Sequence, residues 1–333
     1  MAFIDTIKEK AKQDKKLIVL PESEDPRTYY AASAALRGGF ANIIMLGDKE
    51  RVLDRAKFLK IDLPGITIIN PLTSEKLQGY TDLLTDIRKG KGMTAAKARE
   101  ILVNDYATFG IMMLKADDAD GLVSGCCHAT AEVLRPALQI LKTAPGTELV
   151  SGFFILDGPQ KQYGKNGVVM MADCALNQDP TAAELAAIAG SCAKTFRALV
   201  KDEPIIAMLS HSTKGSAHHP MVDKMIEATR IAKEKYPNLK IDGELQSDAA
   251  IDPEIAHIKA PESDIAGKAN VLVFPNVDCG NIAYKLVQRL GGVDAYGPML
   301  QGIGRPVNDL SRGCSAEDFA GVIAMTAVQA QLR

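Results

Sequence analysis

The feature that most constrains the fold is a repeated unit: a short aliphatic run, a loop of small or polar residues, then a helical pattern. Apolar runs that predict strands lie at 17–20, 42–46, 66–69, 121–125, 147–156, 168–172, 205–209, 239–243 and 271–274. Helical patterns follow many of them, at 28–36, 95–114, 131–141, 181–196, 220–235 and in a segment that runs to about 290. Because strands that alternate with helices form mostly parallel sheets, the sequence predicts an α/β fold. Ligands of such sheets bind beyond the carboxyl ends of the strands, which makes the polar loops the candidate site.

Size and turn chemistry predict the number of domains. A chain of 333 residues corresponds to about two domains. The segment Thr143-Ala144-Pro145-Gly146 interrupts the strand and helix pattern with turn-forming residues, so we expect a boundary near residue 145.

Composition excludes several classes of protein. Hydrophobic residues make up 47% and charged residues 24%, which is typical of globular chains and excludes a disordered one. The formal charge of −2 offers no cationic field for nucleic acid or an anionic membrane. No apolar stretch approaches the roughly 18 residues of a spanning helix, and the charged start has no signal-peptide core. We therefore expect a cytoplasmic protein with a small-molecule ligand.

Cysteine and histidine spacing favours no metal site. The six cysteines include no CxxC pair, which predicts reduced thiols rather than a disulfide framework or a zinc site. His211, His218 and His219 have no carboxylate at a matching spacing. The phosphate-binding motifs GxGxxG and GxxxxGK[ST] and the nucleophile motif GxSxG do not occur in the sequence.

The loop after residue 209 carries hydroxyl groups, a lysine and a glycine at the start of a predicted helix. Such a loop suits an anion, because unpaired N–H groups and the helix dipole both favour negative charge. An ordinary capped turn explains the same residues equally well. The candidate binding residues are Ser212, Thr213, Lys214, Gly215 and Ser216.

Two arginines are candidate anion ligands. Arg135 stands one helical turn beyond a small-residue loop, 125–130, that ends at Thr130, also a candidate binding residue. A guanidinium can hold phosphate through two parallel hydrogen bonds. Arg88 lies in a basic loop, 87–92. The alternative interpretation is that both arginines are exposed to solvent and bind no ligand.

The segment 304–318 contains the richest chemistry. Ser315 and Asp318 have the spacing of a capping box, which explains Asp318 as a helix cap. Ser311 and Arg312 have no comparable local explanation. A serine, an arginine and an aspartate at one helix start would supply a donor, a cation and a base.

Four segments together identify a family. They are GCCHATAEVLRPALQILKTAP at 125–145, ADCALNQDP at 172–180, the STKGS loop, and PVNDLSRGCSAED at 306–318. In this order, and over essentially the whole chain, they resemble the phosphate acetyl/butyryl transferase family. The resemblance implies two α/β domains with mostly parallel sheets and an interdomain cleft, similar to the isocitrate and isopropylmalate dehydrogenases, in a homodimer. It implies a discontinuous first domain, 1–144 plus 297–333, and an inserted second domain, 145–296.

The resemblance also implies the reaction acetyl-CoA + phosphate ⇌ CoA + acetyl phosphate, with CoA as a substrate and no permanently bound cofactor. Asp318 is then the base that deprotonates the CoA thiol, and Ser311 and Arg312 stabilise the developing oxyanion. Arg135 and Arg88 correspond to substrate-binding arginines. The resemblance assigns no ligand to the STKGS loop.

Four alternatives stay open. A related enzyme could prefer a longer acyl group such as butyryl, since one methylene changes binding by only about 1–3 kcal/mol. The shared fold also serves NAD-dependent decarboxylating dehydrogenases, and a non-catalytic protein could bind CoA or acyl phosphate. Within the transferase reading, an acetyl-enzyme on Cys314 is the alternative to direct transfer.

Overall fold

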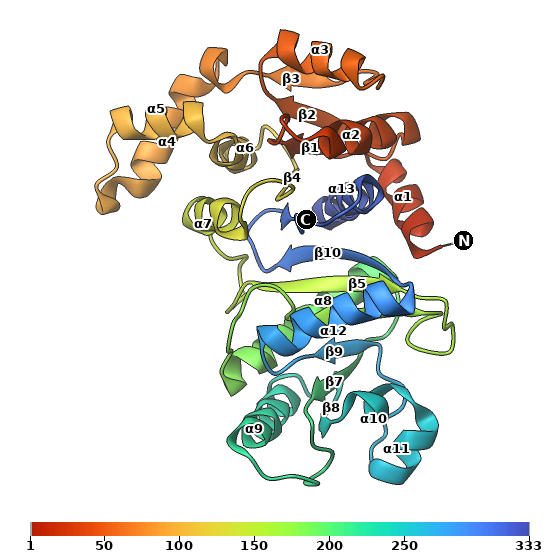
Figure 1. The fold of residues 1–333 in the computed structure, drawn as a ribbon. Helices are drawn as coiled ribbons and strands as arrows, with labels where there is room; N and C mark the ends of the chain where they lie inside the picture. Colours follow the sequence, from red (N-terminus) through yellow and green to blue (C-terminus); the bar gives the residue numbers. More distant parts are fainter. Residues whose placement is uncertain (1, 333) are drawn as a thin grey trace. The chain divides into compact units, whose positions relative to one another are not determined.

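The chain is described by a computed structural model that covers residues 2–332, except for the side chain of Thr130. It divides into two compact units, residues 3–144 with 303–332 and residues 145–302 (Figure 1). The chain returns to the first unit a few residues later than the expected boundary at residue 297. Residue 297 lies inside strand β10 (Asp294–Gln301), which is paired within the second unit's sheet, so the chain returns only after residue 302. No helix within residues 2–332 is long and apolar enough to cross a membrane.

The sheet of the first unit is parallel throughout its described strands. Its strands are β1 (Leu17–Leu20), β2 (Asn42–Leu46), β3 (Thr67–Ile69), β4 (Gly121–Ser124) and β11 (Val307–Asp309), in the order β11-β4-β1-β2-β3. The aliphatic runs of β1 and β2 are almost completely buried, as expected for strands covered on both faces. Strand β11, which was not predicted, has only three residues and includes the polar pair Asn308 and Asp309.

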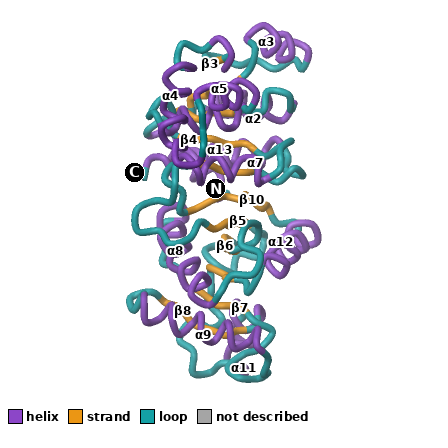
Figure 2. Tube along the Cα trace, turned by 90° about the vertical axis from the view of Figure 1, so that its left-hand side faces the viewer, coloured by secondary structure: helices purple, strands orange, loops and turns teal. Residues whose placement is uncertain are grey.

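Helices cover both faces of this sheet (Figures 1 and 2). One layer holds α1 (Phe3–Gln13), α2 (Pro26–Gly38) and α13 (Ala316–Gln331), which pack on each other, and α3 (Lys49–Phe58) lies beside β3. The other holds α4 (Leu77–Arg88), α5 (Ala95–Asn104), α6 (Tyr106–Lys115) and α7 (Thr130–Ile140). The single helix predicted over 95–114 is two helices. Asp105 has an extended backbone, and its carboxylate accepts from the backbone N of Thr108 at 3.0 Å, so it starts a new helix.

The sheet of the second unit is mixed. Its strands are β5 (Ser151–Asp157), β6 (Val168–Ala172), β7 (Ile205–Leu209), β8 (Lys240–Leu245), β9 (Val271–Val273) and β10, in the order β10-β5-β6-β9-β7-β8. Strand β5 runs antiparallel to both neighbours, and the remaining pairs are parallel. The prediction of an α/β fold with two mostly parallel sheets is therefore confirmed.

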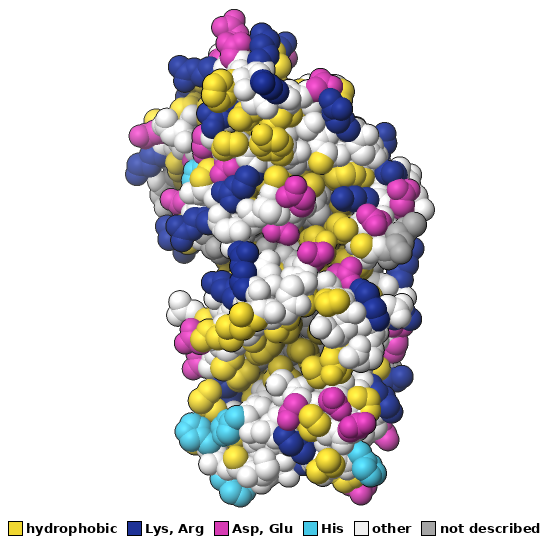
Figure 3. All heavy atoms as spheres, turned by 45° about the vertical axis from the view of Figure 1, so that its right-hand side comes forward, with side chains coloured by type: hydrophobic (Ala, Val, Ile, Leu, Met, Phe, Trp, Pro, Cys, Tyr) yellow, Lys and Arg dark blue, Asp and Glu magenta, His cyan; other side chains and the backbone are white. Residues whose placement is uncertain are grey.

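The helices of the second unit also lie on both faces of its sheet. They are α8 (Ala182–Val200) and α9 (Pro220–Lys235) on one face, and α10 (Ser247–Ile251), α11 (Pro253–Lys259) and α12 (Val277–Gly291) on the other (Figure 2). Figure 3 shows hydrophobic side chains gathering on the surface of this unit. Helix α12 exposes Ile282, Leu286 and Leu290, by 59%, 53% and 83%. It therefore presents an apolar stripe at the surface.

Candidate active site at the carboxyl edge of the first sheet

Three loops meet at one edge of the first sheet. They follow β1, β4 and β11, which are neighbours in the parallel order β11-β4-β1, so their carboxyl ends lie side by side. The loop after β4 begins at Gly125, whose φ is 105°. A Cβ atom there would overlap the Oδ1 atom of Asp309 and the backbone of Leu310. The loops after β4 and β11 are therefore packed against each other so closely that only glycine fits.

Glu22 holds the loop after β4 in place. Its side chain is 1% exposed. Oε2 accepts from the backbone N of Cys126 at 2.8 Å, and Oε1 accepts from the backbone N of Cys127 and of His128, both at 3.2 Å. The ring Nδ1 of His128 lies 2.7 Å from the same Oε1. A buried carboxylate that accepts several N–H bonds is well compensated, so Glu22 stabilises the start of this loop.

Arg27 ties all three loops together. Nη1 donates to the carbonyl oxygens of Arg312 at 2.7 Å and Cys314 at 3.0 Å, and Nη2 donates to the carbonyl oxygen of Cys126 at 2.9 Å. Nη2 is also paired with the carboxylate of Asp25 at 2.7 Å. This hydrogen-bonded ion pair raises the pKa of Arg27 and lowers that of Asp25. One fixed cation therefore positions the main chain of the loop that carries Ser311 and Arg312.

Ser311 and Arg312 lie in the turn between β11 and α13, and Asp318 lies in the first turn of α13. The Arg312 side chain is exposed, and Ser311 and Asp318 are partly exposed. Asp318 forms a capping box with Ser315: its Oδ2 accepts from the backbone N of Ser315 at 2.9 Å, and the Ser315 hydroxyl accepts from the backbone N of Asp318 at 3.0 Å. The helix-cap interpretation of Asp318 is therefore confirmed. It does not exclude a second role, because within residues 2–332 no hydrogen bond reaches Oδ1.

His128 faces several carboxylates. Burial disfavours its charge, but the hydrogen bond with Glu22 and the nearby charges of Glu22, Glu24 and Glu132 outweigh this and raise the pKa of His128. Ligand atoms of Glu22, Cys127 and His128 lie within 4.8 Å of one another, a spacing that a metal ion could use. A metal would have to displace the N–H donors already bound to Glu22. Sequence spacing gave no signal for this cluster, since Glu22 and His128 are 106 positions apart.

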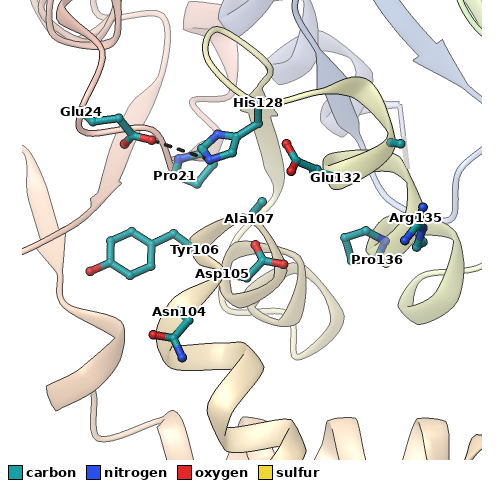
Figure 4. A pocket seen from close by; sticks show the side chains of 11 residues that line it. Pro21, Glu24, Asn104, Asp105, Tyr106, Ala107, His128, Glu132, Arg135 and Pro136 are labelled. Atoms are coloured by element: carbon teal, nitrogen blue, oxygen red, sulfur yellow. Dashed lines mark ion pairs between the residues drawn. The ribbon is translucent and has the colours of Figure 1, made fainter.

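A cavity of about 600 Å³ opens beside these loops (Figure 4). It is lined by loop residues that include Glu24 and His128, by Glu132 and Arg135 of α7, and by the junction of α5 and α6 with Tyr106. Arg135 is exposed. Of the predicted site residues whose side chains the structure describes, only Arg135 lines this cavity.

The other two candidates of the first unit lie differently. Arg88 ends α4 rather than standing in a loop, and its buried Nε has no hydrogen-bond partner within the described chain. It is not among the residues that line the cavity. Thr130 begins α7, and its side chain lies outside the described part of the structure.

The STKGS loop belongs to the second unit and uses its polar groups internally. The backbone N of Gly215 and the hydroxyl of Ser212 both donate to Oε1 of Glu244, at 2.8 and 2.9 Å. Glu244 is 3% exposed and comes from the neighbouring strand β8. The position that an anion would take is therefore occupied by a carboxylate of the chain itself, which favours the interpretation of a structural turn.

The remaining polar groups of this loop are also engaged. Thr213 donates to Oε1 of Gln246 at 3.2 Å, and its backbone N donates to the Ser216 hydroxyl at 3.0 Å. Lys214 donates to Asp242 at 2.7 Å. Burial opposes the charge of Asp242, but hydrogen bonds from Lys214, Lys233 and Ser263 lower the pKa of Asp242 to about 2.

Sequence reasoning missed Glu22, Arg27 and His128. Each is joined to residues far away in the chain, so no local spacing reveals the contacts. The available signal was a charged loop, 21–27, directly after a buried strand at the edge where ligands bind.

Comparisons with known proteins agree on one family. Residues 2–327 match the model of the family described as phosphate acetyl/butaryl transferase. A phosphate acetyltransferase of Acetivibrio thermocellus is 54% identical over 331 residues, which is 99% of this chain and 99% of that protein. A phosphotransacetylase from Streptococcus pyogenes has a crystal structure that is 45% identical and superposes with a TM-score of 0.91, covering 99% of this chain and 98% of that one.

A more distant solved structure shares the fold alone. It is a putative 4-hydroxythreonine-4-phosphate dehydrogenase from Salmonella typhimurium, 13% identical, with a TM-score of 0.53 over 94% of this chain and 99% of that one. The expected likeness to the fold of this dehydrogenase class is thus confirmed. The full-length family match and the high identities settle membership: the chain belongs to the phosphate acetyl/butaryl transferase family.

Proposed function

We propose that the chain is a phosphate acetyltransferase that catalyses acetyl-CoA + phosphate ⇌ CoA + acetyl phosphate. Family membership supports the reaction class, and the high identity to a phosphate acetyltransferase supports the acetyl group. The observation that carries the mechanism is the grouping of Ser311, Arg312 and Asp318 around the start of α13, after a turn whose backbone Arg27 holds.

Asp318 is proposed as the base for the CoA thiol. A free thiol has a pKa of about 8.5, so only a few per cent is thiolate at neutral pH and a positioned base accelerates attack. The cap uses Oδ2 of Asp318 and leaves Oδ1 to accept the proton. The same turn therefore fixes the carboxylate and keeps one oxygen available.

Ser311 and Arg312 are proposed to stabilise the transition state. As the thiolate attacks the acetyl carbon of acetyl phosphate, negative charge develops on the carbonyl oxygen. A donor and a cation placed beside that oxygen contribute about 3 kcal/mol each when they act as oxyanion-hole donors do. Arg135, on the cavity wall, is proposed to hold the phosphoryl group through two hydrogen bonds. Arg88 is kept as a predicted substrate-binding residue, whereas the mechanism uses no residue of the STKGS loop.

Direct transfer in a ternary complex needs no protein nucleophile, because holding both substrates together removes most of the entropic barrier. The alternative, an acetyl-enzyme on Cys314, predicts exchange of labelled phosphate into acetyl phosphate in the absence of CoA. Direct transfer predicts that this exchange requires CoA.

The test compares two variants of the capping box. Asp318→Asn keeps an oxygen that can accept from Ser315 but removes the base, so we expect thioester formation from CoA and acetyl phosphate to fall about 10²–10⁴-fold. Ser315→Ala removes the other half of the cap, costs about 1 kcal/mol of stability, and leaves the base in place. Its rate should stay within a few-fold of the wild type. Equal rates for Asp318→Asn and the wild type would reduce Asp318 to a cap.

Butyryl phosphate in the same assay distinguishes acetyl from longer acyl preference, and a slower reaction than with acetyl phosphate is expected. No transfer with either acyl phosphate would contradict the proposed function as a whole.

We also propose that the protein is a homodimer. The apolar stripe of α12 is the candidate contact, because Ile282, Leu286 and Leu290 are exposed together on one helix. Light scattering of the wild type should give twice the chain mass, and Leu286→Glu should shift the protein toward monomer.

A further inference from the structure

We propose that Cys126 and Cys314 form a peroxide-sensitive thiol pair, a site of reversible disulfide formation at the edge of the active site. Their Sγ atoms lie 3.8 Å apart although the residues are 188 positions apart in the chain. Cys126 stands in the loop after β4, and Cys314 stands in the turn between β11 and α13. The pair therefore bridges the two loops that build most of the candidate site.

The main chain at both cysteines is held by one group. The guanidinium of Arg27 donates through Nη2 to the carbonyl oxygen of Cys126 and through Nη1 to that of Cys314. The same Nη1 lies 3.8 Å from the Sγ atom of Cys314. Because a common cation fixes both backbones, the closeness of the two sulfur atoms is built into the site. To form an S–S bond of about 2.05 Å, the two sulfur atoms must approach each other from 3.8 Å.

The two thiols have different environments. Cys126 is 2% exposed, whereas Cys314 is partly exposed. The hydrogen bond from Cys126 lowers the pKa of Cys314, burial opposes this, and the charge of Arg27 adds to the lowering. The hydrogen bond with Cys314, together with burial, raises the pKa of Cys126. Redox-sensitive cysteines commonly combine an accessible thiolate with a neighbouring resolving thiol, and here Cys314 takes the first role and Cys126 the second.

The chemistry balances with a peroxide as the oxidant. The Cys314 thiolate attacks one oxygen of hydrogen peroxide, the O–O bond breaks, and the products are a sulfenic acid on Cys314 and hydroxide. Cys126 then attacks the sulfur of the sulfenic acid, the S–O bond breaks, and water leaves as the disulfide forms. Two thiols are oxidised and one peroxide is reduced to two waters. A small dithiol reverses the reaction by thiol–disulfide exchange.

Cys127 provides a contrast within the same loop. Its side chain is exposed, but burial of the sulfur and the charges of Glu22 and Glu24 raise the pKa of Cys127. Its Sγ donates to Oε1 of Glu24 at 3.5 Å. Exposure alone would select Cys127 for oxidation, whereas the geometry selects Cys126 and Cys314.

A disulfide here would slow acetyl transfer, and this part of the inference rests on the proposed function. The bond would draw the turn that carries Ser311 and Arg312 toward the loop after β4. A displacement of about 1 Å in a catalytic group can cost roughly 100-fold in rate. We therefore expect oxidation to lower the transfer rate at least about tenfold.

The test uses the full-length reduced protein, treated with hydrogen peroxide, quenched by alkylation and digested without reductant. Mass spectrometry should find the Cys126 peptide linked to the Cys314 peptide, lighter by two hydrogens than the sum of the reduced peptides. The transfer rate should fall in parallel and return after dithiothreitol. Cys127→Ala should form the same link at the same peroxide concentration. Cys126→Ser should form no link, and its Cys314 should oxidise irreversibly.

Peptide mapping keeps this inference separate from the proposed function. The link in wild-type protein supports the thiol pair whether or not the protein transfers acetyl groups. Three outcomes would overturn the proposed thiol pair: peroxide oxidises Cys126 and Cys314 separately, leaves both reduced, or links either one to Cys127. A link that forms while the transfer rate is unchanged would overturn its effect on catalysis.

Discussion

Replacing Glu22 with glutamine turns one carboxylate oxygen into an amide group, which donates hydrogen bonds instead of accepting them. The wild-type carboxylate accepts from the backbone N of Cys126 on one oxygen and from three N–H groups of Cys127 and His128 on the other. The best arrangement of the glutamine keeps its oxygen toward the three donors. The Cys126 N–H then meets an NH₂ group and loses its acceptor.

The cost can be worked out from these contacts. A hydrogen bond to a charged acceptor contributes about 1.5–3 kcal/mol, and this is lost outright at Cys126. The three remaining bonds exchange a charged acceptor for a neutral one, which roughly halves the strength of each and removes about 2–4 kcal/mol in total. Opening of the loop after β4 should therefore become easier by about 4–7 kcal/mol, which is at least a hundredfold in the opening equilibrium.

Amide hydrogen exchange measures this equilibrium at the affected residues. In Glu22→Gln, the amides of Cys126, Cys127 and His128 should exchange at least about a hundredfold faster than in the wild type. Glu24→Gln is the matched control, because the Glu24 side chain is 56% exposed and lies 3.8 Å from Nε2 of His128. It should change these rates by less than about threefold, equivalent to 0.5 kcal/mol or so. Similar exchange rates in the two variants would refute the argument that Glu22 holds the loop.

Three further outcomes follow from the same contacts. The raised pKa of His128 means that its stabilising charge is fully present below its ordinary value of about 6.5 and is lost as pH rises through the folded-state value. Loop exchange should therefore accelerate more steeply over that window in the wild type than in His128→Asn. In Gly125→Ala, the added Cβ atom would overlap backbone atoms and a carboxylate, so urea unfolding should show that the free energy of unfolding falls by about 3 kcal/mol or more. Gly92 has a φ of 74° with open space around it, so Gly92→Ala should lower the free energy of unfolding by about 1 kcal/mol. The Asp242 carboxylate has a pKa of about 2, so above pH 4 it should contribute about 2 kcal/mol to the free energy of unfolding, and this contribution should disappear between pH 4 and 2. In unfolding measurements, Lys214→Met should make this acid-dependent loss of stability smaller.

Strands could be predicted from the sequence where burial alone determines which residue types they contain. The bounds of β1, β2, β6 and β7 coincide with aliphatic runs, because strands covered on both faces by helices need apolar side chains on both. Strand β10 was missed, since its sequence DAYGPMLQ contains a glycine and a proline and pairs antiparallel with β5.

The candidate site was predictable only in part, for a related reason. Ser311, Arg312 and Asp318 are neighbours in the sequence, so their grouping at a helix start could be inferred from spacing and the capping box. Glu22 and Arg27 come together with their partners only through the parallel order of β11, β4 and β1. The sequence shows the charges but not which main-chain groups they hold.

Glu22 and Arg27 also show how the site uses charged side chains to position its backbone. Each carries a charge at the same sheet edge, and each is compensated by main-chain groups and one side chain, His128 for Glu22 and Asp25 for Arg27. A lysine could not replace Arg27. Two nitrogens of the planar guanidinium reach the carbonyl oxygens of Cys126, Arg312 and Cys314 while the group is paired with Asp25. A single ammonium group cannot reach all four partners at once. The exposed side chains at the turn can then carry the proposed chemistry, since the groups that fix their backbone lie beneath them.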